Sequence, residues 1–220
     1  SLRRRQRQMC IRDRTPFRNG EADILIGTQM IVKGHDFPNV TLVAALAADM
    51  SLYAGDYRSS ERTFELLMQA SGRAGRAEKA GEVVIQTYNP EEYSIQAVAG
   101  QDAEYFYENE LAFRRLMKYP PYSQMAAILI LSEEENEAKT LSEKLAENIH
   151  SVCGDAVTLI GPSKAGLSRA KDRYRYVLYV KSMDEEAMDC VREIAEEANR
   201  RVVNQKTCSV QYDRDPVNGY

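Results

Sequence analysis

Short hydrophobic runs alternate with polar segments through the first ninety residues of this 220-residue chain. Two of the runs are predicted to be short buried strands, at residues 24–26 and 40–43, and residues 81–87 are predicted to be a final strand. Between the last two, Phe64, Leu67 and Met68 recur at helical spacing within residues 61–70, so a helix is expected to pack on the strands. Residues 20–90 are therefore predicted to form an α/β region with a parallel sheet.

A helical pattern follows over residues 92–117 and stops at Tyr119-Pro120-Pro121. Five apolar positions of this pattern are predicted to face inward: Ile95, Val98, Phe106, Leu111 and Leu116. Neither proline supplies a backbone N–H, which ends the helix. Residues 91–121 are expected to be a helical connector that ends at a domain boundary.

The remaining residues, 122–220, alternate strand and helix patterns in the order β-α-β-β-α-β. The predicted strands are residues 125–131, 157–161, 173–180 and 207–212, and the predicted helices are 133–152 and 184–203. Two capping boxes are predicted at the helix starts, Ser132 with Glu135 and Ser182 with Glu185. This order predicts a smaller α+β domain with the split βαβ, ferredoxin-like arrangement.

The first fourteen residues contain six arginines and no apolar periodicity. A basic arm that binds DNA is one interpretation. We favour an artefactual leader, read through from an adaptor, vector or fusion join, and leave residues 1–19 unassigned.

Composition indicates an ordinary globular protein, with 44% hydrophobic residues and a net charge of −4. No apolar run is long enough for a membrane helix and no secretion signal is found, so the cytoplasm is the expected compartment. Four cysteines are scattered singly, without C-x-x-C pairs: Cys10, Cys153, Cys190 and Cys208. Reduced thiols and no metal site are therefore expected.

The most distinctive polar pattern is Gln69-Ala-Ser-Gly-Arg-Ala-Gly-Arg76. Arg73 and Arg76 place two permanently charged planar groups three residues apart, and Gly72 permits close approach of a ligand. Arginines of this kind stabilise charge on a transferring phosphoryl group. A solvated, arginine-rich helix start is the alternative that the pattern alone leaves open.

Polar residues also gather where the first predicted strand ends. Gly27 and Thr28 leave this strand at the sheet edge where α/β proteins bind ligands, and they offer an N–H and a hydroxyl to a phosphate. Lys33 adds a positive charge nearby. Thr28 as a simple turn cap is the alternative.

Residues 23–43 resemble motif V of superfamily-two helicases, and residues 69–76 resemble motif VI. Three further segments narrow the resemblance to the primosomal protein N-prime family, the PriA-type replication-restart helicases. They are Ile26-Gly-Thr-Gln-Met-Ile-Val-Lys-Gly-His-Asp-Phe-Pro38, Asp56-Tyr-Arg-Ser-Ser-Glu-Arg62 and Arg115-Leu-Met-Lys-Tyr-Pro-Pro121. The resemblance extends from about residue 20 to residue 220.

The resemblance implies that residues 20–90 are the C-terminal half of a RecA-like helicase lobe, containing motifs V and VI. It implies γ-phosphate contacts for Arg73 and Arg76, with Gln69 positioning the nucleotide or the attacking water. Further roles follow from the motifs: Gly34, Asp36 and Gly72 on the nucleotide side, and Gly27, Thr28 and Lys33 on DNA. Asp36 as an ordinary turn or helix cap is the alternative.

The implied activity is an ATP-dependent 3′ to 5′ DNA helicase that restarts stalled replication forks, using ATP and Mg²⁺ in the full-length protein. Forked or single-stranded DNA, single-stranded-DNA-binding protein and other primosome proteins are the implied partners. The family also binds zinc, but its paired cysteines are not found here.

No G-x-x-x-x-G-K-[ST] loop and no acidic box occur in the sequence, so the chain is expected to be a C-terminal fragment that is inactive alone. The alternative is a non-enzymatic module with a degenerate helicase-like lobe that binds nucleic acid or a protein.

One hairpin of the second domain is strongly basic. Lys171, Arg173 and Arg175 alternate with tyrosines, and a period of two sends the cations to one face of the strand. Two more cations are predicted in the preceding loop, Lys164 and Arg169. This face is predicted to hold a phosphate backbone, with an ordinary solvated strand face as the alternative.

Overall fold

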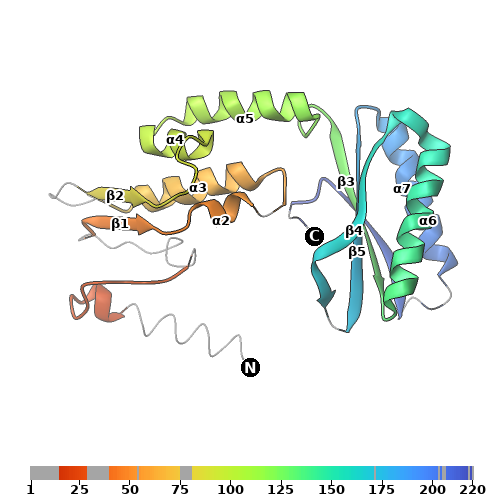
Figure 1. Cartoon of the computed structure of the whole chain (residues 1–220), viewed down its shortest axis with the longest axis horizontal. Helices are drawn as coiled ribbons and strands as arrows, with labels where there is room; N and C mark the ends of the chain where they lie inside the picture. The colour runs from red at the N-terminus through yellow and green to blue at the C-terminus, as the bar shows by residue number, and fades with distance from the viewer. Residues whose placement is uncertain are drawn as a thin grey trace. The chain divides into compact units, whose positions relative to one another are not determined.

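The computed structural model describes residues 15–28, 40–53, 55–74, 81–170, 172–202, 204, 207–217 and 219 (Figure 1). They form two compact units. The first contains the described residues up to 53 and residues 58–106, and the second contains residues 55–57 and the described residues from 107 onward. The chain therefore passes between the units at residues 53–55, at 57–58 and again at 106–107.

In the first unit, β1 (Leu42–Ala45) and β2 (Glu82–Ile85) pair in parallel, with Val43 opposite Val83. The parallel pairing agrees with the sequence pattern. The strand predicted at residues 24–26 is wrong, because these residues form no strand. Ile24 and Ile26 are 78% and 90% exposed, so burial of their side chains does not favour an extended, paired backbone there.

Three helices complete most of this unit: α2 (Asp49–Leu52), α3 (Ser59–Ser71) and α4 (Tyr93–Gly100). Phe64 and Leu67 of α3 lie in the core with Ile95 of α4, and Ala45 and Ile85 of the strands pack against the same cluster. The Phe64 ring stacks on Phe106 with centroids 4.1 Å apart. The predicted inward face of α3 is thus confirmed.

The long helix α5 (Ala103–Met117) differs from its prediction in its second half. Leu111 and Leu116 are 40% and 81% exposed, so the prediction that they face inward is wrong. Glu110 is the buried residue instead, and its Oε1 lies 2.6 Å from Nε of Arg114. An ion pair one helical turn apart occupies the inward face, because a buried carboxylate with a close guanidinium partner is tolerated.

The second unit has a four-stranded sheet in the order β4-β5-β3-β6, and all neighbouring strands run antiparallel. Its strands are β3 (Gln124–Ser132), β4 (Thr158–Ala170), β5 (Arg173–Ser182) and β6 (Cys208–Arg214). Helix α6 (Glu135–Cys153) follows β3, and α7 (Glu185–Arg201) follows β5. The predicted β-α-β-β-α-β order is confirmed.

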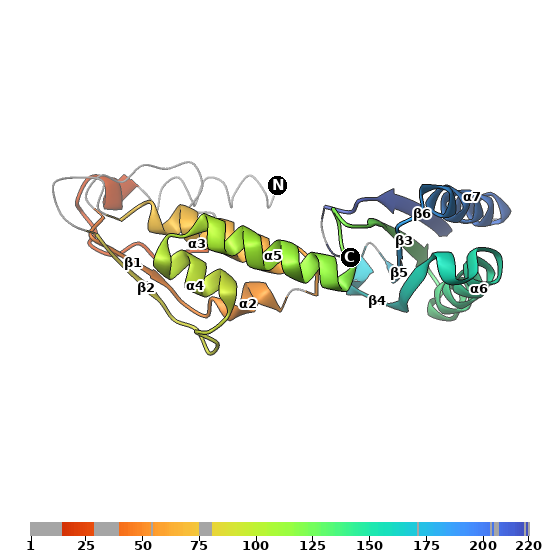
Figure 2. The same ribbon diagram turned by 90° about the horizontal axis from the view of Figure 1, so that it is seen from above.

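Helices α6 and α7 cover one face of this sheet (Figures 1 and 2). Ile128 and Leu178 on the two central strands point into the core beneath the helices, together with Met188 and Val191 of α7. The opposite face has a smaller buried cluster around Leu129 and Val177. The two faces alternate residue by residue, as strand geometry requires.

Helices α6 and α7 each start shortly after a buried serine that ends the preceding strand. The hydroxyl of Ser132 accepts a bond from the Glu134 N–H, and that of Ser182 accepts one from the Asp184 N–H. The predicted capping boxes are wrong, because the N-cap residues of α6 and α7 are Glu134 and Asp184. The two serine hydroxyls donate elsewhere, that of Ser132 to Glu137 and that of Ser182 to the carbonyl oxygen of Ala156. The serines terminate the strands by local turns instead of capping the helices.

Candidate functional site

The arginine-rich motif begins on the last turn of α3. Ala70 is buried on the core side of the helix, whereas Gln69 is exposed on the other side. The helix ends at Gly72, whose N–H donates to the carbonyl oxygen of Met68. The 3.6-residue period thus anchors the motif through one side of α3 and presents Gln69 on the other.

Arg73 is half-buried and directly follows the helix end. Its N–H donates to the Ala70 carbonyl at 3.0 Å, which holds the backbone in a tight turn. Gly72 has an ordinary helical φ of −65°, and a Cβ built on it would meet only main-chain oxygens at 3.5 and 3.8 Å. Packing of the described chain therefore does not demand glycine there. Arg76, the second predicted γ-phosphate contact, lies outside the described residues.

Gly27 and Thr28 are exposed, in a segment without regular structure. Exposure leaves the Thr28 hydroxyl accessible to a ligand. The other predicted residues of this segment lie outside the described residues: Lys33, Gly34 and Asp36.

Asp49 is a buried carboxylate that the sequence reasoning missed. It follows β1 at the N-terminus of α2, and it accepts hydrogen bonds from the Thr87 hydroxyl at 2.5 Å and from the Tyr88 N–H at 2.9 Å. These hydrogen bonds lower the pKa of Asp49, and the bond from Thr87 has the largest effect. Asp49 thereby links the segment that follows β1 to the segment that follows β2. In the sequence, the position of an acidic residue shortly after a predicted strand could have indicated this role.

The basic hairpin of the second unit lies on β5. Arg173 and Arg175 are half-buried and alternate with Tyr174 and Tyr176, which pack in the core beneath the helices. Nη1 of Arg175 donates to the Leu167 carbonyl at 3.2 Å. The two arginines thus share the sheet face opposite the helices, while Lys171 lies outside the described residues.

Lys164 does not belong to this basic face. It lies on β4, in a strand where a loop was predicted, and its Nζ is 2.5 Å from Oε1 of Glu135 at the start of α6. This partner raises the pKa of Lys164 and lowers that of Glu135. Arg169 stacks over the Tyr174 ring at 5.2 Å and lies 3.6 Å from Asp172. The predicted cluster of five cations is therefore smaller than expected.

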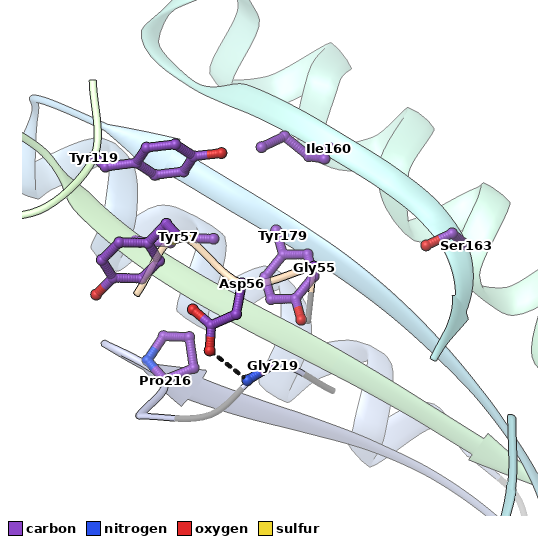
Figure 3. A pocket seen from close by; sticks show the side chains of 10 residues that line it. Gly55, Asp56, Tyr57, Tyr119, Ile160, Ser163, Tyr179, Pro216 and Gly219 are labelled. Atoms are coloured by element: carbon purple, nitrogen blue, oxygen red, sulfur yellow. Dashed lines mark hydrogen bonds between the residues drawn. The ribbon is translucent and has the colours of Figure 1, made fainter. Parts of the chain in front are cut away.

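A pocket of about 230 Å³ lies on the face of the sheet opposite the helices (Figure 3). Its walls are mostly aromatic and apolar: Tyr57, Tyr119, Met125, Ile160, Tyr179 and Pro216. Asp56 is its acidic residue, and Oδ2 accepts a hydrogen bond from the Gly219 N–H at 3.0 Å (Figure 3). The sequence reasoning missed this pocket, because its lining comes from segments far apart in the chain.

The described cysteines are free thiols. Burial raises the pKa of Cys153 to about 11, and a hydrogen bond with Cys190 adds to the effect. A thiol with so high a pKa is a poor nucleophile at neutral pH. Within the described ranges, no group of three or more His, Cys, Asp or Glu residues could hold a metal ion. No helix in the part of the chain that the structure describes is long and apolar enough to span a bilayer.

Two family models match the chain. The primosomal protein N C-terminal domain matches residues 115–217, and the helicase conserved C-terminal domain matches residues 1–78, a range that includes the arginine-rich first fourteen residues.

Relatives named replication restart protein PriA match most of the chain. That of Bacillus subtilis is 46% identical over 91% of this chain and 25% of its own length. That of Synechocystis is 42% identical over 75% of this chain and 20% of its own length. The chain thus spans a quarter or less of the length of these two relatives.

Proposed function

The chain belongs to the primosomal protein N (PriA) family, and we propose that it works as the C-terminal part of an ATP-dependent DNA helicase that restarts stalled replication forks. The match to two successive domain models, over residues 1–78 and 115–217, is the observation on which the proposal rests. In this proposal the chain does not hydrolyse ATP alone, because its sequence has no phosphate loop. The cytoplasm is its proposed compartment.

The end of α3 is the proposed contact with nucleotide. Arg73, at the helix end, and Arg76 donate to the γ-phosphate oxygens, and the exposed Gln69 orients the nucleotide or water. Gly72 is exposed and has no side chain, which lets the ligand come close to the backbone. Gly34 and Asp36 complete the nucleotide side. ATP and Mg²⁺ are the proposed cofactors, and they supply the phosphoryl group and its charge neutralisation.

DNA is the proposed substrate. Gly27, Thr28 and Lys33 contact its phosphates in the first unit, and the exposure of Thr28 supports this role. In the second unit, Arg173 and Arg175 contribute a weaker, sequence-indifferent contact with Lys171. Single-stranded-DNA-binding protein and other primosome proteins are proposed partners, without assigned residues.

We also infer that the first unit is half of a RecA-like lobe and that the second is ferredoxin-like. The parallel β1–β2 pair against α3 supports the first inference. The strand order β4-β5-β3-β6 in a β-α-β-β-α-β chain supports the second, since it is the split βαβ arrangement.

An assay of the complete protein tests the proposal. ATP hydrolysis is measured with and without forked DNA, and unwinding is followed on forks with 3′ or 5′ single-stranded arms. We expect DNA-stimulated hydrolysis and 3′ to 5′ unwinding. Thr28→Ala should weaken the DNA stimulation and leave hydrolysis without DNA unchanged. A protein that binds forks but never hydrolyses ATP would support the non-enzymatic binding module instead.

A further inference from the structure

Two of the segments that mark the family have no role in the proposed chemistry, and they meet in the second unit. Tyr57 belongs to residues 56–62, and Tyr119 belongs to residues 115–121. Their rings are stacked, with centroids 5.2 Å apart and planes inclined by 12°. Sixty-two positions of chain separate the two residues (119 minus 57), so the contact is tertiary.

A cation lies over each tyrosine. The guanidinium carbon of Arg114 is 5.3 Å from the Tyr57 centroid, and Nζ of Lys181 is 4.1 Å from the Tyr119 centroid. We refer to Arg114, Tyr57, Tyr119 and Lys181 as the aromatic stack. Each ring gains from the stacked pair and from an attached cation, which reinforce each other in a partly buried site.

Both cations of the aromatic stack are held by further bonds. Arg114 pairs with the buried Glu110 at 2.6 Å, and Nζ of Lys181 donates to the Met117 carbonyl at 2.9 Å. Burial lowers the pKa of Lys181, and the nearby positive charge of Lys118 lowers it further. The geometry is therefore fixed by residues 107–117 of α5 on one side and by β5 on the other, both of which lie in the second unit.

Residues 55–57 are anchored a second time through the carboxylate of Asp56. This carboxylate accepts the Gly219 N–H at 3.0 Å, on the wall of the pocket (Figure 3). Two adjacent side chains thus hold this short segment of the α2–α3 connection within the second unit.

The anchored segment leads straight into the helix that carries the arginine motif. Helix α3 begins at Ser59, two residues after Tyr57, and its 13 residues end next to Gly72 and Arg73. An α-helix is a stiff connection along its axis. The start of α3 is thus tied through the chain to the second unit, and its end holds the proposed γ-phosphate contact.

We propose that Tyr57 is a positioning residue, and that the aromatic stack transmits the state of the second unit through α3 to Arg73. This inference rests on the proposed function, since it gives the second unit control over the proposed ATP site. It assigns no ligand to the pocket. The stacked face of each tyrosine is covered by the other ring, and a cation already lies over each ring. The aromatic stack therefore holds residues 55–57 in place and does not offer a free ring face on which a ligand could stack.

The test measures ATP hydrolysis by the complete protein at increasing concentrations of forked DNA. Tyr57→Ala should reduce the DNA-stimulated rate about tenfold or more, because small misplacements of a reacting group can cost up to about 10²-fold. Hydrolysis without DNA and the affinity for DNA should stay within about twofold. Tyr57→Phe keeps the ring and should retain the stimulation. Tyr53→Ala is the matched control, since Tyr53 precedes the same connection but is 78% exposed.

A double substitution makes the test specific. Tyr119→Ala should reproduce the loss, and the Tyr57→Ala/Tyr119→Ala pair should lose no more than either single change, because both remove one interaction. Additive losses would contradict the inference. Tyr57→Leu, which retains bulk, replaces Tyr57→Ala if that protein melts early, and it should show the same loss of stimulation.

Amide hydrogen exchange provides a readout independent of ATP. The peptide containing residues 55–58 should exchange faster in the Tyr119→Ala protein than in the parent. A parent that hydrolyses ATP with DNA, together with unchanged stimulation or unchanged exchange in the variants, would overturn the inference and leave the proposed function standing. A parent without any hydrolysis would refute the proposed function and, with it, the control of Arg73.

Discussion

The β-sheets of the two units differ in how much of their surface is buried. In the second unit, β3 has seven buried residues within a nine-residue strand, and both faces of the sheet contribute to packed clusters. In the first unit, β1 and β2 alternate between half-buried and exposed positions, so that Leu42 and Val84 are 55% and 46% exposed.

Parallel strands usually have both faces covered, and β1 and β2 do not. Among the described residues, the sheet of the first unit is thus the less fully covered of the two. Yet the first unit contains the proposed nucleotide site, whereas the well-packed second unit contains only the proposed basic contact with DNA. The difference indicates that the second unit is a stable base. We expect the first unit to depend on additional contacts for the active arrangement of its proposed nucleotide site, because α/β sheets bind ligands at their edges.

The largest expected effect tests the chemistry of the first unit. Arg73→Ala in the complete protein should lower DNA-stimulated ATP hydrolysis by about 10³-fold, because arginines at a transferring phosphoryl group are worth about this much. Steady-state phosphate release measures the loss. Arg200→Ala removes an exposed arginine of α7 and should leave the rate unchanged. A rate within a few-fold of the parent in Arg73→Ala would remove Arg73 from the site.

The second prediction compares the two sheets directly. Leu178→Ala, at a position with no exposed surface, should lower the free energy of unfolding by about 2–5 kcal/mol. Val84→Ala, on the exposed face of β2, should change it by about 0.5 kcal/mol. Urea unfolding of the 220-residue chain, followed by circular dichroism, measures both. Equal losses would mean that the first sheet is covered as fully as the second.

Sequence patterns predicted the second unit well because its faces alternate over long strands and its helices are amphipathic. Residues 125–131, for example, correspond closely to β3. Patterns failed where burial depended on distant partners. Ile24 and Ile26 are apolar but unpaired in any described strand, and Glu110 with Arg114 replaces Leu111 on the inner face of α5.

Prediction of the sites was limited in the same way. Local spacing singled out Gln69, Gly72 and Arg73, and the structure adds that they share the end of one helix. The tyrosine pair of the aromatic stack joins residues 62 positions apart, and the hydrogen bonds of Asp49 join residues 38–40 positions apart. No local sequence pattern encodes contacts at such separations.

A third prediction concerns the pH dependence of the first unit. Because the pKa of Asp49 is lowered on folding, its stabilising contribution is complete above its ordinary value of 3.8 and is lost as the pH falls through the lowered pKa. Asp49→Asn should therefore be less stable than the parent at pH 7, and the difference should shrink below about pH 4. Thermal unfolding between pH 3 and pH 7 measures it, with Asp155→Asn, in an exposed turn of the second unit, as the control. A constant difference across that range would contradict the role of the charge.

The smallest expected effect concerns the basic face of the second unit. Replacing Lys171, Arg173 and Arg175 by Ser should flatten the salt dependence of single-stranded DNA binding. Each phosphate neutralised by a cation contributes about −0.7 to the slope of log affinity against log salt, so three contacts account for about two units. Arg175 also donates to the Leu167 carbonyl, and this bond is expected to make a small contribution to stability.

The control for this change removes the same charge from the helix-covered side. Lys139, Arg200 and Arg201 are exposed on α6 and α7, with side chains 57%, 63% and 78% accessible. Replacing these three by Ser changes the net charge equally and should leave the slope unchanged, because released counterions report contacts and not total charge. Salt titrations of the 220-residue chain distinguish the two variants. Equal slopes in both would make the β5 arginines an ordinary solvated face, and a large fall in melting temperature for the first variant would make them structural.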